Sequence, residues 1–165
     1  MAGAAFRLSR TSEYDRRMSE SPAAGCLFCA IARGEREAAW VFESESCIAF
    51  LDHRPLFIGH VLLIPRRHCA TLGDVPDELL APLLSAARLL AVAVEEALEV
   101  HGALLALNNK VSQSVAHVHW HVIPRRFKDG LRGFFWPRQK YDGPEHVQQV
   151  QSAIAAAVHK RSLSS

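Results

Sequence analysis

The sequence predicts a fold that combines a β-sheet with one long helix, and three patterns carry this prediction. Residues 40–43 and 47–51 are apolar segments of strand length, and the three polar residues between them are typical of a hairpin turn. Residues 61–64 are apolar on both faces, as in a central strand. Apolar side chains recur at helical spacing through residues 77–100, which predicts the long helix.

The remaining segments add to this arrangement. Residues 27–33 suit a short helical turn, which Gly34 would end. Residues 103–107 predict a fourth strand, and we expect the histidine-rich segment 117–123 to form a strand that pairs with it in antiparallel fashion. Residues 145–160 show a weak helical pattern near the end of the chain.

Length and composition favour one globular domain. The 165 residues and the apolar content of 49% are ordinary for a single folded unit. We assign residues 1–25 to a flexible N-terminal tail, in which Met18 could be an alternative start, and residues 26–161 to the domain. The net charge is only +2 and no apolar run is long enough to span a membrane. We therefore expect a cytoplasmic protein without a nucleic-acid or membrane partner.

A basic segment follows the histidine-rich one. Between residues 125 and 140, six lysines and arginines accompany a single acidic residue, Asp129. This segment suits a phosphorylated ligand, and it suits a solvated loop equally well. The apolar residues 134–137 inside it must be buried, either against the core or against a partner chain.

The histidine-rich segment is the strongest functional signal in the chain. His117, His119 and His121 alternate with apolar residues, so an extended strand would place all three imidazoles on one face. A strand face that only meets water more often carries Thr, Lys or Glu. We therefore interpret this segment as a functional site.

Two chemistries fit three imidazoles on one face. Zinc could bind them and activate water, but same-face positions on a strand lie about 6.6 Å apart, and no carboxylate lies nearby in the sequence. A neutral imidazole could instead attack phosphorus and form a phosphoramidate, with its other nitrogen held by a backbone carbonyl. The middle residue, His119, suits this role because it has a potential donor on each side. We favour the second chemistry.

Four cysteines raise the question of a metal site. Cys26 and Cys29 form a Cys-x-x-Cys pair, and Cys47 and Cys69 lie further along the chain. In a reducing compartment such residues are more often thiols or metal ligands than disulfides. The pair alone is a weak signal, because a zinc site needs two more ligands.

The histidine segment and several further motifs resemble the histidine triad (HIT) family. The segment matches the pattern His-φ-His-φ-His-φ-φ, in which φ is apolar. The likeness covers roughly residues 26–125, with the motifs in the order that the family has. The other matching stretches are residues 26–35, 49–52, 55, 59–68, 108–109, 113–115 and 123–125.

This resemblance implies an α+β, HIT-like fold with a five-stranded antiparallel sheet, one long helix and a C-terminal helix, usually in a homodimer. It implies hydrolysis or transfer of a nucleoside monophosphate through a nucleotidyl-histidine intermediate. The substrate would be a dinucleoside polyphosphate or a nucleoside phosphoramidate, and the ligand a purine nucleotide. His119 would be the nucleophile, and His121 and His60 would contact the phosphate. The nucleotide-binding residues would be Asp52, Asn108, Gln113 and Ser114.

The resemblance also supplies partners for the cysteine pair. Family members that keep Cys-x-x-Cys can bind structural zinc (Zn²⁺) with one downstream histidine and the first histidine of the triad. In this chain the ligands would be Cys26, Cys29, His68 and His117. The metal would connect the N-terminal turn to the histidine strand, and no metal would be required at phosphorus.

The chain departs from the family pattern in two places. Lys110-Val111-Ser112 replaces a glycine-rich stretch in a shortened turn before the triad, and Trp120 is larger than the usual residue. The base preference, the role of residues 125–141 and the choice among hydrolysis, phosphorolysis and transfer stay open. A non-catalytic nucleotide sensor and a hydrolase with catalytic zinc are the alternative functions.

Overall fold

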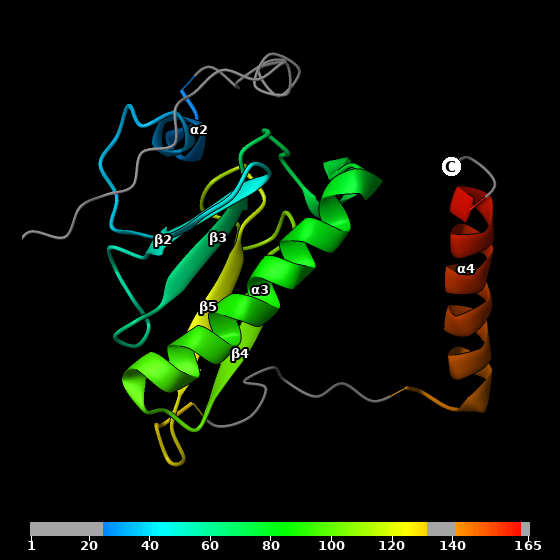
Figure 1. The fold of residues 1–165 in the computed structure, drawn as a ribbon. Coiled ribbons are helices and arrows are strands. Elements are labelled where there is room, and N and C mark those ends of the chain that lie inside the picture. Colours follow the sequence, from blue (N-terminus) through cyan, green and yellow to red (C-terminus); the bar gives the residue numbers. More distant parts are fainter. Residues whose placement is uncertain (1–24, 132–140, 163–165) are drawn as a thin grey trace, which may run out of the picture. The chain divides into compact units, whose positions relative to one another are not determined.

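The computed structural model describes residues 25–131 and 141–162 and contains the sheet and helices that the sequence predicts (Figure 1). The chain divides into two units, of which the first ends at Asp129 and holds the whole sheet. The second begins at Gly130 and holds the C-terminal helix α4. The predicted tail before Gly25 and the apolar residues 134–137 lie outside the described residues.

The first unit is built on one five-stranded antiparallel sheet, with the strand order β1-β2-β3-β5-β4. This architecture confirms the predicted α+β fold. The strands are β1 (Trp40–Glu43), β2 (Cys47–Leu51), β3 (Val61–Pro65), β4 (Gly102–Leu107) and β5 (Trp120–Arg125). The helices are α2 (Leu27–Ala32), the 3-10 turn η1 (Leu72–Asp74), α3 (Asp77–Leu98) and, in the second unit, α4 (Pro144–Ser162).

Strand β5 lies inside the sheet, between β3 and β4. Its His121 is opposite Leu62 of β3 on one side and opposite Ala106 of β4 on the other. Both pairings are antiparallel, as predicted for β4 and β5. Because neighbours hydrogen-bond to β5 on both edges, the position of His121 is fixed by the sheet.

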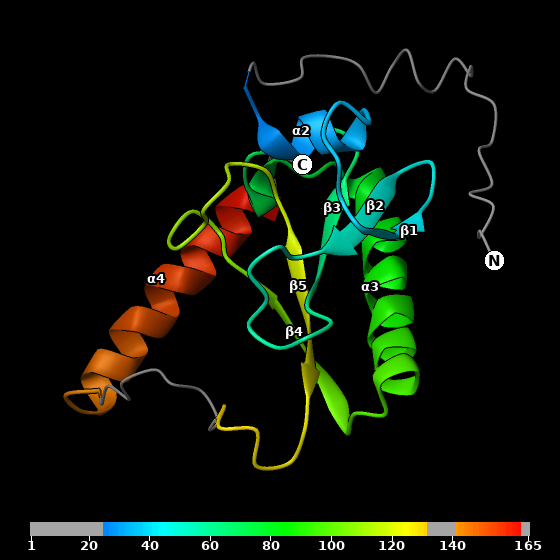
Figure 2. The same ribbon diagram turned by 90° about the vertical axis from the view of Figure 1, so that its left-hand side faces the viewer.

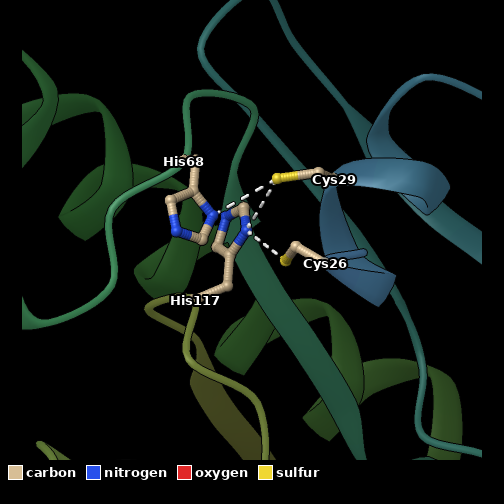
Figure 3. A group of neighbouring side chains, drawn as sticks. All are labelled: Cys26, Cys29, His68 and His117. Atoms are coloured by element: carbon tan, nitrogen blue, oxygen red, sulfur yellow. Dashed lines mark hydrogen bonds between the residues drawn. The ribbon is translucent and has the colours of Figure 1, made fainter. Parts of the chain in front are cut away.

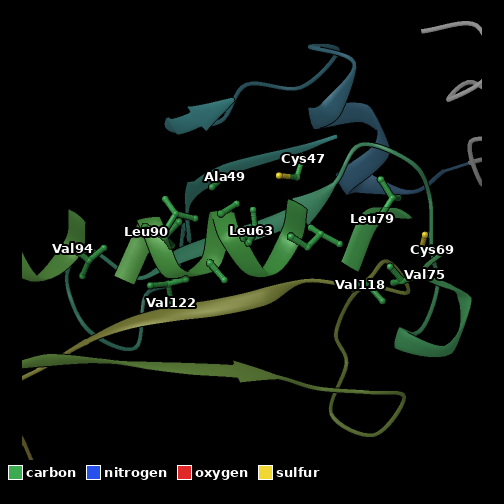
Figure 4. Packing of buried hydrophobic residues seen from close by; sticks show 14 residues of the cluster. Cys47, Ala49, Leu63, Cys69, Val75, Leu79, Leu90, Val94, Val118 and Val122 are labelled. Carbon is green, nitrogen blue, oxygen red and sulfur yellow. The ribbon is translucent and has the colours of Figure 1, made fainter. Parts of the chain in front are cut away.

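The two faces of the sheet pack against different helices. Leu63 and Val122 belong to a core that includes the buried stripe of α3 (Figure 4). Leu62 and Phe50 point the other way and pack against Phe28 of α2. Figure 2 shows α2 at one end of the sheet and α3 running beside the strands. The buried stripe of the long helix therefore covers one face of the sheet, and the face beneath α2 is left to carry the site.

Helix α3 begins at Asp77, as the apolar spacing predicts, and continues through Pro82. It ends at Leu98 because Glu99 adopts a left-handed conformation (φ 49°) and closes the helix with a bond from its N–H to the Glu95 carbonyl. Within the described parts of the chain, no helix is both long enough and apolar enough to cross a membrane.

Candidate active site and metal centre

The regular part of the histidine strand begins later than the sequence predicts. β5 starts at Trp120, so His117 and His119 lie in the chain just before it. The predicted strand start at residue 117 is therefore wrong. The backbone there makes a different bond, from the Val118 N–H to the Cys69 carbonyl at 2.7 Å, which ties it to the segment after β3.

Side chains of the segment nevertheless alternate between the two faces. Val118 and Val122 are buried in the core beneath α3. The rings of His117 and His119 lie on the other side, where both make edge-on contacts with the ring of Phe28. These two residues precede the paired part of β5, so packing against α2 orients their imidazoles instead.

His119 is held in one tautomer by the backbone. Its Nδ1 lies 2.7 Å from the carbonyl oxygen of His117, and only a protonated nitrogen can donate to that oxygen. The lone pair therefore resides on Nε2. The side chain is only 2% exposed. This is the arrangement that the phosphorus chemistry requires, with the backbone carbonyl in the predicted role.

His60 and His121, which we call the histidine pair, bond to each other. His60 Nε2 lies 3.0 Å from His121 Nδ1. The other nitrogen of His60 lies 3.2 Å from the backbone N of Leu56, which donates to it. His121 Nε2 is buried, and it has no hydrogen-bond partner among the described residues. A polar atom of a ligand would satisfy it.

Burial keeps the histidine pair neutral at physiological pH. The pKa of His121 falls to about 4, first because of burial and then because His119 and His60 would repel a positive charge. Burial also lowers the pKa of His60, although the Asp52 carboxylate opposes the shift. A neutral imidazole is donor at one nitrogen and acceptor at the other, so the tautomer decides what it binds.

Asp52 lies beside the histidine pair, at the end of β2. Its Oδ2 is 3.5 Å from His60 Nδ1, and its Oδ1 accepts a hydrogen bond of 2.9 Å from the Arg54 N–H. The carboxylate is 17% exposed. It can therefore accept a hydrogen bond from a ligand, as the predicted ribose contact requires.

The turn before the triad is anchored by its amide side chains. Gln113 Oε1 accepts from the Lys110 N–H at 2.8 Å, and Gln113 Nε2 donates to the Ala70 carbonyl at 2.7 Å. Asn109 Oδ1 accepts from the Leu72 N–H at 2.9 Å. Both ends of the Gln113 amide are thus engaged within the protein.

The same turn exposes the other predicted phosphate ligands. Asn108 and Ser114 are both exposed. Lys110 (φ 71°) and Ser112 (φ 60°) adopt left-handed conformations, which is why a glycine-rich stretch is common at such a position. This chain holds the strained turn through the anchors of Gln113 and Asn109 instead.

A second cluster joins the four residues predicted to bind zinc, and we call it the metal cluster (Figure 3). His117 Nδ1 is 3.5 Å from the Sγ atoms of both Cys26 and Cys29, and His68 Nδ1 is 3.3 Å from Cys29 Sγ. The four ligand atoms all lie within 4.8 Å of one another. Zn–S bonds of about 2.3 Å and Zn–N bonds of about 2.0 Å give a tetrahedral S···N edge of about 3.5 Å. The donor set and its spacing fit Zn²⁺.

The outer contacts of His117 also suit a metal ligand. Its Nε2–H donates to the Pro65 carbonyl at 2.9 Å, which leaves the Nδ1 lone pair facing the two sulfurs. Burial lowers its pKa to about 4, so the ring is neutral. Cys26 and Cys29 reach the cluster from the start of α2, where positions three apart share one side of a helix.

The first two arginines of the basic segment do not contribute to the site around His119. Arg125 pairs with Asp129, and Arg126 donates to the carbonyls of Leu98 and Glu99 at the end of α3. Arg125 is the last residue of β5 and Arg126 follows it, about 20 Å along the strand from His119 at the rise of an extended chain. The residues 132–140 lie outside the described part.

Sequence reasoning missed three backbone or packing groups of the site. They are the Leu56 N–H on His60, the Pro65 carbonyl on His117 and the ring of Phe28 between two imidazoles. Neither backbone group has a residue type that could signal it. Phe28 lies inside the Cys-x-x-Cys motif, which is the one signal that could have pointed to it.

Comparison with known proteins places these clusters in context. The family model of the HIT domain matches residues 33–128, more than half of the chain. The chain is 38% identical over 120 residues to the adenosine 5'-monophosphoramidase of Saccharomyces cerevisiae, covering 72% of this chain and 74% of that protein. A HIT family member from Bacillus subtilis superposes with a TM-score of 0.73 at 36% identity, covering 80% of this chain and 96% of that one. A zinc-bound histidine triad family protein from Mycobacterium smegmatis superposes with a TM-score of 0.63 at 34% identity, covering 82% and 97%.

Proposed function

Because the chain belongs to the HIT family, whose hydrolases and transferases it resembles throughout the domain, we propose that it cleaves the bond between a nucleoside monophosphate and a leaving group. The reaction passes through a nucleotidyl-histidine intermediate on His119. The bond from His119 Nδ1–H to the His117 carbonyl carries this proposal, because it leaves the Nε2 lone pair available to attack phosphorus. The yeast relative is an adenosine 5'-monophosphoramidase, which supports a purine phosphoramidate or phosphoanhydride as substrate.

The reaction consists of two displacements at phosphorus. In the first, the His119 Nε2 lone pair forms the N–P bond while the bond to the leaving group breaks, and the leaving group departs with the electron pair and gains a proton from solvent. In the second, water forms a P–O bond, the N–P electrons return to Nε2, and the water releases a proton. The His117 carbonyl stabilises the charge on the His119 ring between the two steps.

The nucleotide is held by groups around His119. Asp52 accepts hydrogen bonds from the ribose hydroxyls, and Asn108 and Ser114 offer exposed polar side chains to phosphate or leaving group. Gln113 orients their turn, because its amide is committed to Lys110 and Ala70. His121 Nε2–H donates toward the phosphate oxygens.

We also propose that the metal cluster holds a structural zinc ion. Zinc there would join α2 to the chain before β5 and so fix the position of the His117 carbonyl that orients His119. The zinc-bound relative from M. smegmatis supports this assignment. Four protein ligands would leave no open position for water, which argues against a catalytic zinc.

The proposed intermediate gives a direct test. The protein is mixed with an adenosine phosphoramidate or a dinucleoside polyphosphate, quenched, and analysed by peptide mass spectrometry. We expect a nucleotidyl adduct on His119 in the wild type, none in His119→Gln, and turnover at least about a thousandfold lower in that variant. His101→Gln, at an exposed histidine outside the pocket, is the matched control and should form the adduct normally. Tight nucleotide binding without adduct or turnover would contradict catalysis and favour a sensor.

We propose further that the chain acts as a cytoplasmic homodimer. Apolar residues outside the buried stripe of α3 support a partner chain, because Leu80, Leu84, Leu89 and Val92 are 41–68% exposed. Light scattering after gel filtration tests this proposal, and a monomer at micromolar concentration would contradict it. Fractionation of the source cells tests the location.

A further inference from the structure

We propose that the loop of residues 52–60 locks the tautomer of His121, so that His121 presents a fixed N–H donor to the phosphate and does not act as a general acid. His60 is then a positioning residue, which acts through His121 and does not touch the substrate. This inference rests on the proposed function and deepens it, because it assigns the source of the leaving group's proton to solvent.

The first hydrogen bond of the lock has a fixed direction, because its donor is a backbone N–H. The backbone N of Leu56 can only donate, and it lies 3.2 Å from His60 Nδ1. His60 Nδ1 must therefore accept, which places the ring proton of the neutral side chain on Nε2. His60 is 5% exposed, so water does not compete effectively for these positions.

The hydrogen bond between His60 and His121 then fixes the tautomer of His121. His60 Nε2–H points to His121 Nδ1 at 3.0 Å, so His121 Nδ1 accepts and its proton resides on Nε2. That Nε2 is buried and has no acceptor in the described parts of the chain. A buried N–H without a partner costs free energy, and a phosphate oxygen supplied by a nucleotide would remove that cost.

The loop is held firmly enough to impose this direction. The Asp52 N–H donates to the His60 carbonyl at 2.9 Å, and the His60 N–H donates to the Phe57 carbonyl at 3.0 Å. Gly59 has a positive φ of 90°, and a Cβ there would lie 2.2 Å from Leu98 Cδ1. The loop therefore closes against the end of α3, and Gly59 adopts a backbone conformation that other residues rarely adopt.

The direction of the bonds excludes proton release by His121. If a neutral His121 gave up its Nε2 proton, its ring would become an anion unless His60 passed a proton to Nδ1. His60 would then need a new proton at its own Nδ1, where the neighbours are the Leu56 amide and the Asp52 carboxylate at 3.5 Å. An amide does not release its proton, and an ionised carboxylate has none to give.

The tautomers themselves provide the first test. Long-range proton–nitrogen NMR correlations on the full chain, without substrate, identify the protonated nitrogen of each assigned ring. We expect both His60 and His121 to carry the proton on Nε2. Leu56→Pro removes the donating N–H and should introduce the Nδ1-protonated form of His60, whereas Leu56→Ala removes most of the side chain but keeps the N–H and should keep the wild-type pattern. An Nδ1-protonated or cationic His60 in the wild type would overturn the proposal.

A kinetic test remains informative if the proline variant does not fold. His60→Leu removes the donor to His121 and should lower kcat about 10- to 100-fold with little change in nucleotide affinity. His60→Gln offers an amide N–H to His121 Nδ1 and should recover most of that loss, which a merely structural role would not predict. The loss in His60→Leu should be similar for leaving groups of high and low basicity, because no proton passes through His121. A loss confined to basic leaving groups would overturn the proposal.

These outcomes separate the lock from the function on which it rests. An adduct on His119 together with the wrong tautomers would end the lock and leave the proposed function standing. The expected tautomers without any adduct would end the proposed function and leave the lock as a feature of a binding site.

Discussion

The metal cluster and the histidine pair are both built from buried histidines, but the ring nitrogens are arranged for different purposes. In the metal cluster, His117 gives its Nε2–H to the Pro65 carbonyl and turns Nδ1 toward two sulfurs. In the histidine pair, the ring nitrogens of His60 and His121 face each other, and one outer nitrogen is buried without a partner among the described residues. The first arrangement gathers lone pairs around one point, as a metal requires. The second leaves a buried ring nitrogen of His121 available to a ligand.

His119 lies between these regions and holds the opposite tautomer to His117. Its proton is on Nδ1, where the His117 carbonyl accepts it, whereas the His117 proton is on Nε2. The backbone carbonyl at each ring thus decides which of its nitrogens keeps a lone pair. Three histidines in one motif thus become distinct through the partner of each ring. The partner is the Pro65 carbonyl for His117, the His117 carbonyl for His119 and the His60 ring for His121.

The largest expected effect concerns the metal cluster. Cys29→Ala removes a buried thiol of the metal cluster and, if the cluster holds zinc as proposed, should lower the free energy of unfolding on the order of 5 kcal/mol, because metal binding is coupled to folding. A chelator should lower the melting temperature of the wild type and leave that of Cys29→Ala unchanged. Cys69→Ala, at a cysteine as deeply buried outside the cluster, should cost about 1 kcal/mol and keep the response to chelator. Equal responses of the two variants would contradict the metal cluster.

Acid should destabilise the histidine pair. The folded pKa of His121, about 4, lies below its ordinary value of 6.5, so the unfolded chain takes up a proton first as the pH falls. Stability is therefore full above pH 6.5 and is lost as the pH falls toward 4, by at most about 3 kcal/mol for this group. Urea unfolding at pH 7 and pH 4.5 should show a smaller pH effect in His121→Gln than in the wild type. The same slope in both proteins would mean that His121 is not the group responsible.

Phe28 touches both His117 and His119 and so offers a way to compare the two sites. Phe28→Leu should cost about 1.5 kcal/mol of stability and also lower turnover several-fold, because His119 loses its ring contact. Phe50→Leu, in the same packing cluster, should cost a similar stability and leave turnover near the wild-type value. Urea unfolding and steady-state kinetics on both variants check this prediction, which equal losses of turnover would refute.

The smallest effect is expected at the far end of β5. Arg126→Ala removes two hydrogen bonds to the end of α3 and should cost about 1 kcal/mol. Nucleotide affinity should not change, because Arg126 lies far from His119 along the strand. Isothermal titration with a nucleoside monophosphate measures this affinity. A tenfold loss would indicate that the basic segment contributes to nucleotide binding.

The sequence predicts the fold well because its signals are local. The spacing of apolar residues marks α3 and the five strands, and the short polar turn between β1 and β2 marks the hairpin. The start of β5 is the exception. His117 and His119 alternate like strand residues, but the segment leaves the ladder to bond with Cys69, and that depends on a distant part of the chain.

The same difference between local signals and distant contacts decides which parts of the site the sequence predicts. Side chains with distinctive chemistry, such as the four members of the metal cluster, can be found by spacing and resemblance, and the structure brings them together. The commitment of both ends of the Gln113 amide to the backbone cannot be read from the sequence, because it depends on where Lys110 and Ala70 lie after folding. The Leu56 N–H is hidden for the same reason, since every residue except proline has that group.

The most direct test of the account asks whether His117 and His119 serve separate sites. Native mass spectrometry of the wild type and of His119→Gln, each mixed with an adenosine phosphoramidate, reports bound zinc and nucleotidyl adduct in one measurement. We predict one zinc ion per chain in both proteins and an adduct in the wild type alone. Loss of zinc from His119→Gln, or an adduct that persists in it, would contradict the division of the triad into a metal ligand and a nucleophile.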